Sequence, residues 1–188
     1  MVHSVVTLLF ISNLCIPSQQ NCDIRFEGID LSTKKYRVEM VPAYFFSYTP
    51  VEIKNDLLTE NLITTTAQLT QIEDDIQLRL RVEVASKQAR SVYGGISAGS
   101  VLVITLINED ELRLQCEVGS QGRFNDLETG FIYEMSYALD RRSIKKLQKA
   151  EIDKLALQWT SGLEEYTIYE VDLLLNQLTC LQSVTRPN

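Results

Sequence analysis

The stretch IQLRLRVEV, residues 76–84, decides the fold class. Its apolar side chains recur at every second position from Ile76 to Val84, with glutamine, arginine or glutamate between them. Side chains alternate between the two faces of a strand, so this pattern predicts a β-strand with one buried and one wet face. The acidic turn 73–75 and the Thr-rich extended residues 62–71 precede it, which predicts an antiparallel hairpin.

The same period continues along the chain. The same alternation, or in one case a continuous apolar run, predicts further strands at 101–107, 112–118, 131–139, 155–159 and 166–168. Short helices are predicted after the capping residues Thr49, Asp140 and Asp172. We therefore predict a mainly β (α+β) fold, an antiparallel β-sandwich-like domain of about nine strands with two to four short helices. A partly open barrel is the alternative.

The N-terminal residues have the pattern of a signal peptide, which predicts that the protein is exported. Residues 1–18 contain no Asp, Glu, Lys or Arg, and their apolar run has the length of a signal-peptide core, with Ser18 at a suitable cleavage position. The run is too short to span a bilayer, which takes about 20 apolar residues. We predict a signal peptide at 1–18, a single β-rich domain at 19–188, and a periplasmic, outer-membrane-associated or extracellular location. The usual basic start is missing, so the alternative is a cytoplasmic protein with an N-terminal strand.

The cysteines fit export as well. Cys22 and Cys180 stand near the two ends of the mature chain, and the termini of a domain often lie close together, so we predict that they form a disulfide. Two buried free thiols are the alternative. Cys116 lies in an alternating strand pattern and is interpreted as a small core side chain.

Charge and composition argue against several functions. The net charge of −7 opposes binding to nucleic acid. The stretch YGGISAGSV, residues 93–101, resembles a phosphate-binding loop, but it has no lysine and a strand-like segment follows it, so no nucleotide is expected. The single histidine is His3, which leaves the mature chain without imidazole for metal binding or nucleophilic catalysis. We predict no cofactor, no metal and no enzyme activity, with carboxylate-dependent glycan cleavage as the remaining catalytic chemistry.

Two segments are candidate contact sites. Five basic residues fall within nine positions and predict an anionic contact, with a solvated helix face as the alternative: Arg141, Arg142, Lys145, Lys146 and Lys149. A second set puts aromatic side chains on both faces of an extended segment and predicts a contact with sugar rings or protein: Tyr44, Phe45, Phe46 and Tyr48. Cover by the following predicted helix, residues 50–58, is the alternative there.

The layout of the chain resembles that of small exported proteins of unknown function of the Bacteroidota type. The resemblance is carried by Gln20-Asn21-Cys22, Tyr93-Gly94-Gly95, the short basic helix and the closing segment from Asp172 to Leu181. It implies an envelope location and no known activity. We predict a non-catalytic exported cell-envelope protein, a binding or structural module whose partner is an envelope protein or a glycan. The alternative is a carbohydrate-binding or carboxylate-dependent glycan-active module.

Overall fold

A computed structural model describes residues 22–50, 61–126 and 129–184 of the chain. The predicted signal peptide, its cleavage site and, apart from Pro50, the predicted helix at 50–58 lie outside the described residues. The described part contains eleven strands: β1 (Ile24–Ile29), β2 (Tyr36–Met40), β3 (Ala43–Tyr48), β4 (Ile63–Ile72), β5 (Asp75–Val84), β6 (Val101–Leu106), β7 (Glu111–Val118), β8 (Arg123–Asn125), β9 (Gly130–Leu139), β10 (Ile152–Trp159) and β11 (Gly162–Thr167). Its three helices are α1 (Ala89–Val92), α2 (Arg141–Leu147) and α3 (Leu173–Ser183).

The hairpin predicted around IQLRLRVEV is confirmed. β4 and β5 pair antiparallel over their whole length, from Ile63 opposite Val84 to Ile72 opposite Asp75. The even-numbered apolar side chains of β5 are buried in the core, whereas its glutamine, arginine and glutamate side chains are only partly buried on the other face. The alternation in the sequence therefore reports which face of the sheet meets the core.

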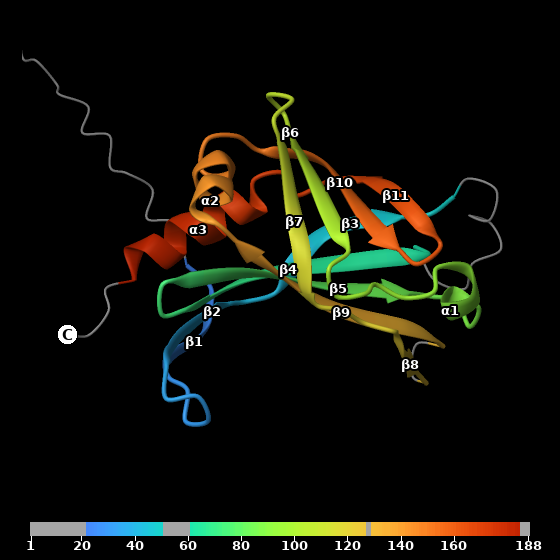
Figure 1. The fold of residues 1–188 in the computed structure, drawn as a ribbon, viewed down its shortest axis with the longest axis horizontal. Coiled ribbons are helices and arrows are strands. Elements are labelled where there is room, and N and C mark those ends of the chain that lie inside the picture. The colour runs from blue at the N-terminus through green and yellow to red at the C-terminus, as the bar shows by residue number, and fades with distance from the viewer. Residues whose placement is uncertain (1–21, 51–60, 127–128, 185–188) are drawn as a thin grey trace, which may run out of the picture.

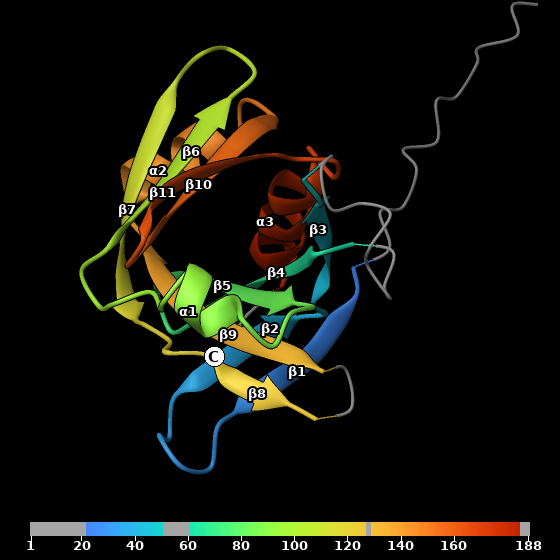
Figure 2. The same ribbon diagram turned by 90° about the vertical axis from the view of Figure 1, so that its right-hand side faces the viewer.

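The strands form one antiparallel sheet that bends into two layers. Along the sheet the order is β1-β2-β4-β5-β9-β7-β6-β10-β11, with β3 added on β4 and β8 on β9. Figures 1 and 2 show the β6, β7, β10 and β11 layer facing the layer that contains β4, β5 and β9. β9 pairs with β5 along most of its length and with β7 at only two positions, Cys116 with Tyr137 and Val118 with Ser136. The mainly β, sandwich-like prediction is confirmed, and its two layers are parts of a single curved sheet.

The β11 end of the bent sheet approaches β3, the strand added on β4. The carbonyl of Phe45 accepts backbone hydrogen bonds from Tyr169, at 3.4 Å, and Glu170, at 3.3 Å, just after β11 ends. Phe46 stacks on Tyr166 of β11 with ring centroids 5.0 Å apart. These contacts close the core on the side opposite β9.

The helix ends follow their predictions only in part. The carboxylate of Asp140 accepts a hydrogen bond from the backbone N–H of Ser143 at 2.7 Å, so the predicted cap of α2 is confirmed. Asp172 makes no side-chain cap, which corrects the prediction for α3. Its backbone is already helical, with φ −98° and ψ 0°, and its carbonyl accepts from the N–H of Asn176. A carboxylate caps a helix from an extended backbone, and Asp172 lacks that conformation.

The glycine-rich loop leads into a strand. Gly94 and Gly99 have φ values of +73° and +83°, in the left-handed region that glycine adopts readily. β6 begins at Val101, immediately after the loop, as the apolar sequence predicts. The helix N-terminus that would face a bound phosphate is therefore not formed by the residues that follow this loop.

Candidate functional site

All five basic residues predicted as an anionic contact line one pocket. Its volume is about 540 Å³, and the turn between β6 and β7 forms the opposite wall. We call it the α2 pocket, and its lining residues are Asn108, Asp110, Arg141, Arg142, Lys145, Lys146 and Lys149.

The helix period places these cations on the outer side of α2. Ser143 and Leu147 are buried and anchor the helix to the body, and Ile144 packs partly against the core. Residues four apart lie on the same face of a helix, so Arg141 and Lys145 form one exposed stripe and continue toward Lys149 just beyond the helix end. Fixing one apolar edge in the core therefore turns the basic edge outward.

One ion pair connects the two walls of the pocket. The ammonium of Lys146 lies 3.0 Å from a carboxylate oxygen of Asp110 and donates to the backbone carbonyl of Glu111 at 3.2 Å. Its hydrogen bond and its charge lower the pKa of Asp110, and Arg142 adds to the same effect. Asn108 supports the turn by accepting from the N–H of Asp110 at 3.2 Å. The turn is therefore held against α2 in an ordered geometry.

The pocket carries a local excess of positive charge. Lys146 is the one of its five cations that forms an ion pair of 4.0 Å or less within the described part of the chain. Asp110 is the one carboxylate among the described residues of its lining. Guanidinium groups bind carboxylates and phosphates through two parallel hydrogen bonds, and ammonium groups act as point charges. This arrangement can bind an anionic group on a chain whose overall charge is negative.

A larger groove of about 730 Å³ lies on the polar face of β4, β5 and β9. Three arginines line it, Arg25 from β1 and Arg79 and Arg81 from β5. Arg81 pairs with Glu83 at 2.7 Å and Glu134 at 3.2 Å, and Arg79 lies 3.4 Å from Glu39. These neighbouring carboxylates offset most of the positive charge, so this groove is less basic than the α2 pocket.

Among the described residues, the lining of the groove shows few of the groups used to cleave glycans. Glu134 is the one carboxylate among its lining residues, whereas two are needed to cleave a glycosidic bond by acid–base chemistry. No aromatic side chain belongs to the part of its lining that the structure describes. The groove offers hydrogen-bonding groups, including Thr66, Gln68 and Ser136, which suit binding better than cleavage.

The aromatic segment does not form one contact surface. Phe45 and Phe46 are adjacent and both fully buried, because the strand is irregular between Tyr44 and Phe46 and two neighbouring side chains turn inward. Their assignment to a surface contact is corrected, and both belong to the core. Tyr44 and Tyr48 are 41% and 40% exposed and remain at the surface.

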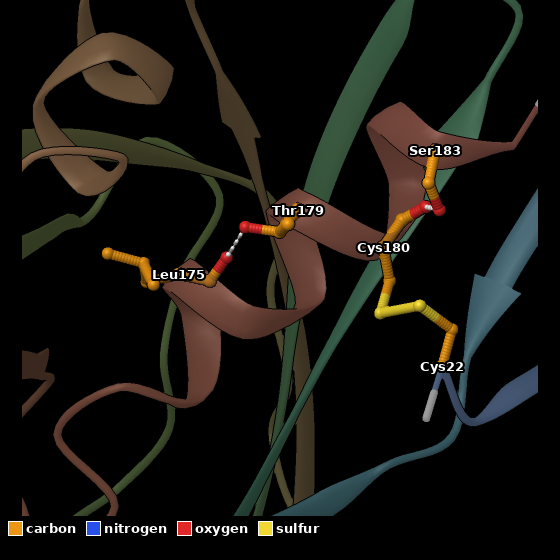
Figure 3. Close-up of a disulfide and its surroundings, with 5 residues drawn as sticks. All are labelled: Cys22, Leu175, Thr179, Cys180 and Ser183. Carbon is orange, nitrogen blue, oxygen red and sulfur yellow. Dashed lines mark hydrogen bonds between the residues drawn. A yellow bond between two sulfur atoms is a disulfide. The ribbon is translucent and has the colours of Figure 1, made fainter. Parts of the chain in front are cut away.

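The predicted disulfide is present. Cys22 and Cys180 are bonded, with their Cα atoms 5.5 Å apart, and the bond attaches the chain before β1 to α3 (Figure 3). In the same turn of α3, Ser183 donates a hydrogen bond to the carbonyl of Cys180 at 2.7 Å. Cys116 is buried and forms no disulfide, as its strand pattern predicts.

The described part of the chain shows neither a cluster of metal ligands nor a membrane-spanning helix. Among residues 22–50, 61–126 and 129–184, no three His, Cys, Asp or Glu side chains are grouped so that they could hold a metal ion. No described helix combines the length and the apolar character needed to cross a membrane.

The sequence indicated the α2 pocket but not the groove. The five cations of the pocket lie within one short segment, so local spacing reveals them. Arg79 and Arg81 lie two positions apart, on the face of β5 that points away from the core, and this spacing could have indicated a basic surface there. Arg25 joins them from a strand more than fifty positions earlier, and only the pairing of β1 and β2 beside β4 brings it near.

Comparison with protein-family models, with curated proteins and with solved structures gives no match. The interpretation of the α2 pocket therefore depends on its own geometry and charge.

Proposed function

We propose that this chain is a non-catalytic exported module of the cell envelope that docks the acidic surface of a protein partner onto the α2 pocket. The observation that carries the proposal is the pocket itself, where five cations meet one carboxylate on a protein with a net charge of −7. The terminal disulfide supports an oxidising location, where such bonds persist. The uncharged leader-like start supports export.

The test is cross-linking of the protein in its native cells, followed by mass spectrometry of the mature N-terminus and the attached chains. We expect a start near Gln19 and an envelope partner that the triple variant Arg141→Gln/Lys145→Gln/Lys149→Gln no longer captures. The matched control removes three exposed cations elsewhere, Lys87→Gln/Arg90→Gln/Arg123→Gln, and should keep the partner. An intact Met1 in the cytoplasm would overturn the location, and equal capture by both variants would overturn the docking site.

A carbohydrate-binding module is the second candidate, favoured by the groove with its three arginines and its hydroxyl and amide groups. It predicts binding of an oligosaccharide that contains uronic acids, because guanidinium groups pair with carboxylates. Calorimetric titration should then show binding that Arg25→Gln weakens and the triple α2 variant does not. Equal binding by the Arg25 variant and the wild type would argue against this candidate.

A further inference from the structure

The hairpin of β1 and β2 ends in an apolar tip. It projects from the body of the molecule in both views (Figures 1 and 2). Leu31, at the turn, is 82% exposed, and Ile29, at the end of β1, is 61% exposed. Leu31 is the most exposed large apolar side chain of the described part of the chain. Turns usually carry polar residues, so an outward leucine at this place needs an explanation.

The turn holds Leu31 outward in a defined geometry. The carboxylate of Asp30 accepts hydrogen bonds from the N–H groups of Ser32 at 2.8 Å and Thr33 at 3.2 Å. The backbone N–H of Asp30 donates to the carbonyl of Lys35 at 2.9 Å, and the N–H of Lys34 donates to the carbonyl of Asp30 at 2.8 Å. An ordered turn has already lost the conformational freedom that binding would otherwise remove.

The charged side chains at the tip differ in whether they form ion pairs. Arg37 neutralises Asp30 through a contact of 2.8 Å between guanidinium and carboxylate. Lys34 and Lys35 are exposed, and neither forms an ion pair within the described residues. Two apolar side chains therefore stand beside two exposed cations that form no ion pair among the described residues. They lie at the end of a hairpin whose outer edge is covered by no described strand, since β1 pairs with β2 alone.

We propose that this tip contacts an anionic lipid surface. Leu31 and Ile29 enter the boundary between headgroups and acyl chains, and the two lysines remain among the anionic headgroups. An acidic chain is repelled by an anionic bilayer as a whole, so it approaches through a local cationic element. An apolar socket in a partner protein would explain Leu31 but would have no use for both lysines. With only two apolar side chains, the contact is reversible.

Co-sedimentation with vesicles tests the proposal. The full chain is mixed with vesicles of phosphatidylcholine and phosphatidylglycerol, or of phosphatidylcholine alone, and we expect binding to the anionic vesicles that salt weakens. Leu31→Ser and Lys34→Gln/Lys35→Gln should each lower the binding constant about tenfold. Matched controls are Leu163→Ser, at an exposed apolar residue on β11, and Lys87→Gln/Arg123→Gln. Both should bind as the wild type does.

Fluorescence gives an independent measurement of depth. The chain has one tryptophan, Trp159, which is buried and should not respond to vesicles. The indole introduced by Leu31→Trp should shift its emission to the blue when anionic vesicles are added, because it leaves water. The same substitution at Leu163 should show no shift.

Absence of binding to anionic vesicles, or tip variants that bind as the wild type does, would overturn the proposal. Loss of binding only in Arg141→Gln/Lys145→Gln/Lys149→Gln would also overturn it, and would assign the lipid contact to the α2 pocket. Leu31 is mostly exposed, so unfolding does not explain a loss of binding, and the thermal midpoints of the variants check this. The result of the vesicle experiments does not depend on whether a protein partner binds the α2 pocket.

Discussion

Asp30 is the residue on which the shape of the β1–β2 turn depends. Its hydrogen bonds from the side chain and backbone of Ser32, followed by that from Thr33, lower its pKa from 3.8 to about 2. A carboxylate with a lowered pKa stabilises the folded state above its unfolded pKa, near 3.9, and this stabilisation is lost as the pH falls through about 2.

We therefore expect NMR titration of the Asp30 carboxyl to give a midpoint near pH 2. The protection of the Ser32 and Thr33 amides, relative to the exchange rate of an unstructured peptide at the same pH, should fall between about pH 4 and pH 2. In Asp30→Asn this pH-dependent loss of protection should be absent, because the side-chain amide of asparagine does not titrate. Asp126, an exposed aspartate in another turn, serves as the control for chain-wide effects of acid. A midpoint near 4 for Asp30 would mean that the turn is not organised by its carboxylate.

Gln177 carries a second interaction at the residue scale. Its side-chain carbonyl accepts from the backbone N–H of Leu69 at 2.7 Å, and its amide lies 3.4 Å from the carbonyl of Val41. These groups lie in the gap on β4 between the segments that pair with β2 and with β3. A side chain from α3 thus replaces the missing strand partner, in agreement with the rule that buried backbone groups are hydrogen-bonded.

Gln177→Ala should lower the free energy of unfolding by about 1–3 kcal/mol, because the N–H of Leu69 stays buried without an acceptor. Urea denaturation measures this loss. The control is Gln182→Ala, at an exposed position of the same helix, which should change stability by less than about 0.5 kcal/mol. Equal values for the two variants would show that water or another group can replace Gln177.

At the scale of the element, α2 places like charges close together. Arg141 and Lys145 are four positions apart, as are Arg142 and Lys146, and a pair of like charges at this spacing destabilises a helix by about 0.2–0.5 kcal/mol. Asp110 relieves the second pair through Lys146, while the first pair has no such partner within the described residues. A helix arranged in this way gains stability when it binds an anion.

Lys145→Gln should therefore raise the free energy of unfolding by about 0.3 kcal/mol in low salt, while it weakens capture of an acidic partner. High salt screens the repulsion, so the stability difference should vanish in about 1 M NaCl. Thermal denaturation at the two salt concentrations measures both effects, with Lys87→Gln as the control outside α2. A destabilised variant at low salt would show that Lys145 is held by a favourable contact instead.

Elements differ in how far their sequence predicts them. The β4–β5 and β6–β7 hairpins follow from alternation and from polar turns, since strand, turn and partner are all local. The inward turn of both Phe45 and Phe46 does not follow, because an irregularity in the pairing of β3 with β4 breaks the alternation. Asp172 matches a cap by residue type, but its backbone conformation decides otherwise. In the first failure a strand pairing distant in sequence overrides a local preference, and in the second the backbone conformation does.

At the scale of the whole molecule, the bend of the sheet depends on strand pairings that no local sequence pattern predicts. β9 joins the layers through two residue pairs with β7, and α3 packs on β4 from the end of the chain. The α2 pocket was predictable because its cations are neighbours in sequence, whereas its opposite wall comes from the β6–β7 turn more than thirty positions earlier. The sequence therefore predicts the charge of the site, and the fold supplies its shape.

The disulfide acts on this whole arrangement. Cys22 and Cys180 are 158 positions apart, so their bond closes almost the entire described chain into a loop. On the chain-entropy account, a crosslink over such a loop stabilises the fold by up to about 5 kcal/mol, because it restricts the unfolded chain. It also ties the chain just before β1 to α3, and α3 buries Leu174, Leu178 and Leu181 in the core. The bond thus connects the first described strand to the last element.

Cys22→Ser/Cys180→Ser should lower the free energy of unfolding by about 2–5 kcal/mol, measured by urea denaturation at neutral pH. The slope of the free energy against urea should rise, because an unfolded chain without the crosslink exposes more surface. Dithiothreitol should lower the midpoint of the wild type and leave the double variant unchanged, since Cys116 is buried and unbonded. A midpoint in the wild type that does not respond to reduction would contradict the entropic role of the bond. A lower midpoint with an unchanged slope would instead assign the loss to contacts in the folded state around the Cys22–Cys180 bond.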